Sequence, residues 1–95
     1  MKGDTVLRKN PNVVSRVIAD ETVLLPIYRT SKEINCIYTL NKSASRIWEL
    51  IDGKRRLDGI RGRIAEEFAV TEAHLQKELG KVLSELLEIK AVTKK

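Results

Sequence analysis

The chain has little of the chemistry that catalysis or metal binding requires. Its 95 residues include one cysteine, Cys36, and one histidine, His74. A lone cysteine cannot form an intramolecular disulfide, and one thiol with one imidazole does not provide the ligand set of a structural zinc site. Neither residue stands in a motif with a plausible catalytic mechanism, and no glycine-rich phosphate loop is present. The sequence therefore predicts a protein that is not an enzyme and that holds no metal or cofactor.

Long apolar runs are also missing. No segment approaches the roughly 20 apolar residues of a membrane-spanning helix, and the N-terminal residues lack the apolar core of a signal peptide. We therefore expect a cytoplasmic protein with no membrane partner. A chain of 95 residues has the size of one domain. We expect that domain to span residues 1–95, with residues 1–12 as a flexible arm that is ordered only if something holds it.

The first half of the chain is rich in β-branched and aromatic residues, which occur in three short runs separated by polar turns. These runs, residues 13–18, 23–28 and 36–40, predict three antiparallel strands. Pro26 cannot donate a hydrogen bond to a neighbouring strand, so we expect it at an edge or a bulge of the second strand.

The pattern becomes helical after residue 40. Asn41 is a favourable N-cap, and Gly53 suits the position after a helix end, so a first helix is expected over residues 42–52. Asp58 is the expected N-cap of a second helix. The residues expected to share its apolar face are Ile60, Ile64, Ala65 and Phe68.

A third helix, capped by Thr71, has the strongest periodicity in the chain. Its apolar residues recur on one face: Leu75, Leu79, Val82, Leu83 and Leu86. The order of elements predicts an α+β fold of the winged helix-turn-helix type, with a three-stranded antiparallel sheet followed by three α-helices. This fold type alone does not define a function.

The formal net charge of +5 suggests nucleic acid as one alternative partner. The basic cluster consists of Lys54, Arg55, Arg56, Arg61 and Arg63. The third helix, which would have to enter a DNA groove, instead carries a mixed-charge polar face: Glu72, Gln76, Lys77, Glu78, Lys81, Ser84, Glu85 and Glu88. This face opposes specific reading of bases, because its carboxylates repel phosphates. We expect no specific nucleic-acid partner.

The third predicted strand suggests peptide binding as the other alternative. It carries apolar side chains on both faces: Ile34, Cys36, Tyr38 and Leu40 on one, and Ile37 on the other. An open sheet edge beside an apolar helix can accept an extended peptide as a further strand. The same surplus of apolar surface is also compatible with a homodimer, or with a sheet that its own helices cover.

Residues 37–53 carry a family resemblance. The order Tyr-x-Leu-Asn, a small residue, and then Arg46-Ile-Trp-Glu-Leu-Ile-Asp-Gly53 resembles the PqqD-like family, and the likeness extends over residues 14–92. The resemblance implies a non-catalytic winged-helix protein that binds the leader of a ribosomally synthesised precursor peptide. It further implies a partner that modifies the peptide, such as a radical S-adenosylmethionine (SAM) enzyme. The product, pyrroloquinoline quinone (PQQ) or another modified peptide, stays open.

The resemblance also implies where the peptide binds. The groove would lie between the third strand and the third helix. The residues that it assigns to this groove are Asn35, Cys36, Ile37, Tyr38, Gln76, Lys77, Gly80, Leu83 and Leu87.

Overall fold

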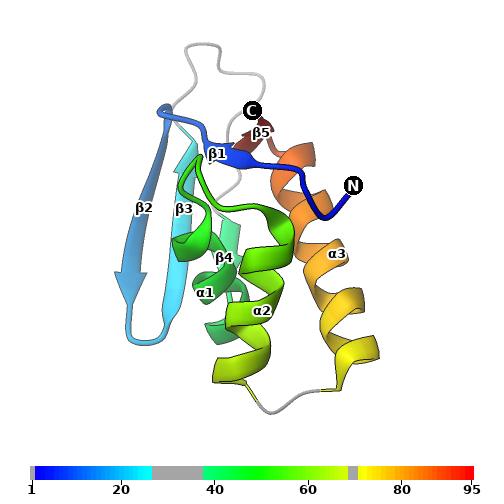
Figure 1. The fold of residues 1–95 in the computed structure, drawn as a ribbon. Helices are drawn as coiled ribbons and strands as arrows, with labels where there is room; N and C mark the ends of the chain where they lie inside the picture. The colour runs from blue at the N-terminus through cyan, green and yellow to red at the C-terminus, as the bar shows by residue number, and fades with distance from the viewer. Residues whose placement is uncertain (1, 27–37, 69–70) are drawn as a thin grey trace.

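The structure is a computed structural model, and it describes residues 2–26, 38–68 and 71–95. The elements follow one another as β1 (Leu7–Lys9), β2 (Val13–Ile18), β3 (Glu21–Pro26), β4 (Tyr38–Leu40), α1 (Lys42–Leu50), α2 (Leu57–Glu67), α3 (Glu72–Glu88) and β5 (Val92–Lys94) (Figure 1). The predicted order of three strands followed by three helices is confirmed for β2 to α3.

The main sheet is antiparallel, in the order β2-β3-β4. Tyr38 pairs with Leu24, and Leu40 pairs with Thr22. Leu24 and Thr22 are almost fully buried, so this register turns Tyr38 and Leu40 toward the core. The second strand begins at Glu21, two positions before the predicted start at Val23, because the tight turn at Ala19 and Asp20 lets pairing resume at once.

Two of the helices begin at the predicted side-chain caps. The Ala44 amide donates to Asn41 Oδ1 over 2.9 Å, and the His74 amide donates to Thr71 Oγ1 over 3.2 Å. These bonds satisfy amide groups that have no partner within the first turn.

The prediction for the start of α2 is wrong. The N-cap is Arg56, which makes no side-chain capping bond, and Asp58 lies inside the first turn. At that position its carboxylate still interacts favourably with the positive N-terminal end of the helix dipole. Ala65 is also not on the buried face, which is formed by Leu57, Ile60 and Ile64.

The core lies where the three helices meet the inner face of the sheet. Trp48 is 3% exposed, and Ile60 and Leu86 are fully buried, so each helix contributes to one continuous cluster. All five apolar residues predicted for the third helix belong to this cluster. None of the described helices is long and apolar enough to cross a membrane.

The N-terminal segment is held by the C-terminus. β1 pairs antiparallel with β5, so that Leu7 lies opposite Lys94, and Leu7 is 1% exposed. The Gly53 amide donates to the Leu7 carbonyl over 3.0 Å. Residues 7–9 thus form a strand that residues 92–94 hold. The sequence indicates that this segment needs a partner to be ordered, but it does not indicate which residues provide it.

Candidate functional site

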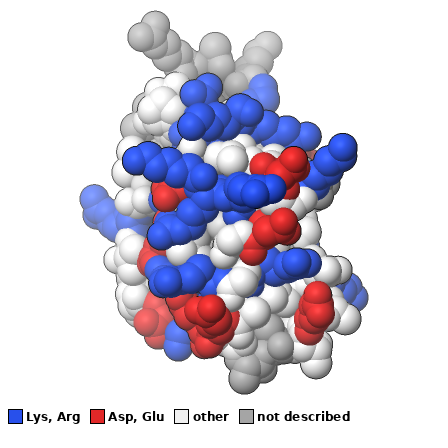
Figure 2. Space-filling view, in the orientation of Figure 1, with Lys and Arg blue, Asp and Glu red and all other residues white. Residues whose placement is uncertain are grey.

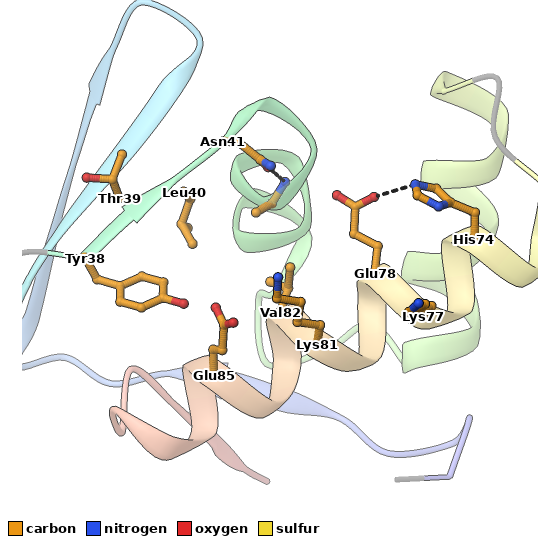
Figure 3. A pocket seen from close by; sticks show the side chains of 11 residues that line it. Tyr38, Thr39, Leu40, Asn41, His74, Lys77, Glu78, Lys81, Val82 and Glu85 are labelled. Carbon is orange, nitrogen blue, oxygen red and sulfur yellow. Dashed lines mark hydrogen bonds and ion pairs between the residues drawn. The ribbon is translucent and has the colours of Figure 1, made fainter.

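A groove of about 470 Å³ runs between β4 and α3 (Figure 3). One wall is the end of the sheet and the start of α1, and the other wall is one side of α3. The lining residues are Tyr38, Thr39, Leu40, Asn41, Ala44, His74, Lys77, Glu78, Lys81, Val82 and Glu85. The resemblance implies a peptide site between the third strand and the third helix, and this groove lies between those two elements.

The bottom of the groove is apolar. Leu40, Ala44 and Val82 line it, and they are 3%, 5% and 8% exposed. These side chains belong to the hydrophobic core, so the core itself reaches the surface here. An apolar side chain placed over them would remove further hydrocarbon surface from water, which contributes roughly 25 cal/mol per Å².

The rim of the groove is charged. Glu78 accepts a hydrogen bond from the Ser43 hydroxyl, and its other oxygen lies 3.5 Å from His74 Nε2 (Figure 3). Glu78 thereby links the first turns of α1 and α3. Lys77 and Lys81 are exposed and form no ion pair with any residue that the structure describes. Glu85 lies at the Tyr38 end, where the tyrosine ring extends toward it.

One edge of β4 lies beside this groove. Among the described residues, β4 pairs with β3 alone, so the main-chain groups on its other edge have no partner strand. An unpaired strand edge can accept another extended chain. The groove therefore combines a strand edge that is free to pair among the described residues, an apolar bottom and a charged rim.

The structure separates the predicted site residues into several groups. Tyr38 and Lys77 line the groove, whereas Gln76, Gly80 and Leu83 line a second hollow of about 320 Å³ on the other side of α3. That hollow is bounded by α2 and the N-terminal segment. Leu87 is half-buried and packs against the core. The predicted residues Asn35, Cys36 and Ile37 lie outside the described part of the chain.

The α3 residues that line the groove lie on a different helical stripe from most of the α3 residues that the resemblance assigns to peptide binding. Successive helix residues are rotated by about 100°, so a neighbouring stripe lies on a different face. Leu83 is 2% exposed and faces the core between helices rather than the groove. The groove stripe is His74, Glu78, Lys81 and Glu85. The spacing of four, three and four residues in the sequence indicates that these residues share one face of the helix. Their charges, however, are typical of a face exposed to solvent, so the sequence does not mark this face as a groove wall.

The basic cluster lies away from the groove. Figure 2 shows Lys and Arg side chains gathered across the upper half of the face that carries β1. Arg55 Nη1 lies 3.1 Å from Asp52 Oδ2, and two backbone amides donate to Oδ1 of the same carboxylate. These amides lower the pKa of Asp52. Within the cluster, Arg61 and Arg63 also have carboxylate partners, Asp58 and Glu67, so the cluster is partly neutralised.

The fold and the groove define a class: a small α+β domain of winged-helix type in which one edge of β4, unpaired among the described residues, lies beside the last long helix. The chain belongs to the PqqD family, because the family described as "Coenzyme PQQ synthesis protein D (PqqD)" matches residues 21–92. This agrees with the resemblance seen in the sequence.

A solved structure supports the same assignment. It is described as "TbiB1 in Complex with the TbiA(beta) Leader Peptide". Its TM-score is 0.74 with 27% sequence identity, and the match covers 90% of this chain and 93% of that one. No match was found among curated proteins.

Proposed function

We propose that this protein binds the leader segment of a ribosomally synthesised precursor peptide as an added strand on β4. The observation that carries the proposal is the groove, which sets beside α3 an edge of β4 that pairs with no other described strand. Membership of the PqqD family and the likeness to a protein solved with a leader peptide support it.

The physics of strand addition explains how such a site would bind a peptide. Main-chain hydrogen bonds to β4 provide affinity with little dependence on sequence. Side chains of an added strand alternate between the two faces of the sheet. Every second side chain therefore points toward α3, over Leu40 and Val82, while the others point to the outer face.

In this proposal the protein performs no chemistry itself. It holds the leader so that a peptide-modifying enzyme, such as a radical SAM protein, acts on the rest of the precursor. This places the protein in the cytoplasm, where the precursor is translated. Asn35, Cys36 and Ile37 directly precede Tyr38 in the chain and remain the proposed continuation of the peptide-binding strand.

The test is a titration with the leader peptide of a precursor encoded beside this protein, followed by fluorescence anisotropy. We expect saturable binding by the leader and none by a scrambled leader of the same composition. A series of leaders with one N-methylated amide each tests the mode of binding. Methylation at alternate positions should abolish binding, because it removes the donors that face β4. Equal binding by every methylated leader would contradict strand addition.

The enzyme step needs a separate measurement. The neighbouring modifying enzyme should modify the full precursor faster when this protein is present, and a precursor without its leader should gain nothing. An acceleration that does not require the leader would contradict presentation by leader capture.

Homodimerisation is a second proposal, carried by a different surface. The exposed large apolar side chains among the described residues are Val14, Val17, Ile18 and Leu25. All four lie on the β2–β3 hairpin, away from the groove. Sedimentation velocity tests this proposal: Val17→Lys with Ile18→Lys should dissociate a dimer and leave leader binding intact. A monomer at all concentrations would contradict it.

A further inference from the structure

We infer that the groove selects leader segments that carry an acidic side chain and an apolar side chain on the same face of the extended peptide, the face toward α3. The inference rests on the proposed function and specifies the chemistry of its client. It comes from the distribution of charge along the groove, from the spacing of two lysines and from the apolar bottom.

The lysine side chains of the groove have no ion-pair partner among the described residues, whereas one of its two carboxylates already has partners. Lys77 and Lys81 are exposed and have no ion-pair partner among the described residues. Glu78 is already engaged by Ser43 and His74. The remaining carboxylate, Glu85, lies at the opposite end of the groove, facing Tyr38 (Figure 3). The half of the groove nearer Asn41 therefore carries a net positive charge, because its two lysines, Lys77 and Lys81, outnumber its one carboxylate, Glu78.

The spacing of these lysines fits an extended chain. Residues four apart on a helix are separated by about 6 Å along its axis. Side chains two apart on a strand, which point the same way, are separated by about 6.6 Å. Because β4 and α3 both border the groove, a strand added to β4 lies alongside α3. Consecutive helix-facing side chains of the peptide then reach Lys77 and Lys81 in turn.

The bottom of the groove defines the other requirement. Leu40, Ala44 and Val82 offer no polar partner from their side chains, so a helix-facing apolar side chain fits over them. A lysine or arginine of the peptide in the same row would face Lys77 or Lys81 and be repelled. The client is thus an extended acidic and apolar segment rather than a basic one.

The experiment uses an mRNA-displayed library of randomised peptides selected against the full-length protein. The wild type should enrich sequences with Asp or Glu in one alternating row together with an apolar residue. The double variant Lys77→Glu/Lys81→Glu should enrich Lys or Arg at those positions instead. The matched control Lys54→Glu/Lys94→Glu makes the same change in net charge on exposed residues outside the groove and should enrich the same sequences as the wild type.

One enriched peptide then gives the strength of the preference. Replacing its acidic residue by the neutral amide should weaken binding to the wild type by about fivefold, as expected for exposed ion pairs, and the effect should shrink at high salt. The same replacement should not weaken binding to the charge-reversed variant. Circular dichroism confirms that each variant is folded.

The outcomes separate this inference from the proposed function. Enrichment of strand-like peptides without an acidic bias, unchanged by charge reversal, would overturn the inference and leave peptide binding standing. Enrichment of acidic peptides that the control variant also loses would show a general charge effect and overturn it too. If no peptide is enriched on any form of the protein, the proposed function fails and the inference fails with it.

Discussion

The two sides of α3 differ in what they leave open. Toward α2, the helix buries Leu79 and Leu83 against other helices, and the hollow above them is lined by side chains of α2 and the N-terminal segment. Toward β4, the helix faces a strand whose outer edge has no partner among the described residues. Among the described residues, the second side therefore presents a strand edge that a ligand could pair with through main-chain hydrogen bonds.

In the proposed function, this difference lets one helix contribute to stability on one side and to binding on the other. The side toward α2, called the closed side here, holds the helix in place through buried apolar side chains. On the side toward β4, the open side, residues of the same hydrophobic core form the bottom of the groove. Substitutions on the closed side should therefore change stability, and substitutions on the open side should change binding.

The largest effect is expected for Leu83→Ala. Leu83 is 2% exposed, so the truncation leaves a cavity in the core and should lower the free energy of unfolding by about 2 to 5 kcal/mol. Urea denaturation measures it. The neighbouring exposed residue provides the control, since Ser84→Ala should be nearly neutral. A Leu83→Ala protein of normal stability that has lost only leader binding would show that Leu83 belongs to the open side.

Tyr38→Ala should have the next largest effect, and it should act mainly on binding. Tyr38 is half-buried at one end of the groove, where its ring provides contact area at low entropic cost. We expect leader binding to weaken by about 1 to 2 kcal/mol, measured by anisotropy. Tyr38→Phe keeps the ring and should bind nearly as well as the wild type. Unchanged binding by Tyr38→Ala would show that this end of the groove is not part of the binding site.

Gly80→Ala distinguishes the two sides by a gain in stability. Gly80 lies inside α3 on the closed side, and an added Cβ would meet nothing within 4 Å. Alanine should stabilise the helix by up to about 1 kcal/mol, which thermal unfolding measures. Leader binding should not change. Loss of binding would mean that a partner approaches the helix backbone at Gly80, which the family resemblance assigns to the groove.

The smallest effect concerns the acid stability of the helical layer. Arg46 Nε donates to Glu67 Oε1 over 2.7 Å and Nη2 donates to Oε2 over 2.8 Å, which joins α1 to the end of α2. These bonds lower the pKa of Glu67 below its ordinary value of 4.5. A carboxyl group with a lowered pKa in the folded state stabilises the fold above its unfolded pKa and ceases to do so as the pH falls through the lower value.

Arg46→Gln should therefore be less stable than the wild type at neutral pH and should lose less stability on acidification below about pH 5. Urea midpoints across this range measure the slope. Arg16→Gln is the matched control, because the exposed Arg16 has no carboxylate partner among the described residues. Equal slopes for Arg46→Gln and the wild type would show that the ion pair contributes nothing measurable.

Much of the fold follows from the sequence, because local signals and burial agree there. Asn41 and Thr71 mark helix starts through bonds to residues three positions ahead, and the apolar stripe from Leu75 to Leu86 has one possible inner face. The pairing of β1 with β5 does not follow, since two three-residue strands at opposite ends of the chain carry no periodicity that relates them.

The groove itself is predictable only in part. The sequence locates it between a strand and a helix, but the side of α3 that lines it depends on the rotation of the helix about its axis. Tertiary packing sets that rotation. Lys81 and Glu85 have the composition of a solvent-facing stripe, and only the position of β4 turns this stripe into a wall of a groove.

A backbone amide titration by NMR with the leader peptide decides whether β4 and the facing side of α3 form the binding site. We expect shifts in Tyr38 to Asn41 and in the groove stripe of α3, with slowed exchange at the edge of β4. Shifts confined to the basic cluster, residues 54–63, or to the α2 side of α3 around Gln76 and Gly80, would contradict it.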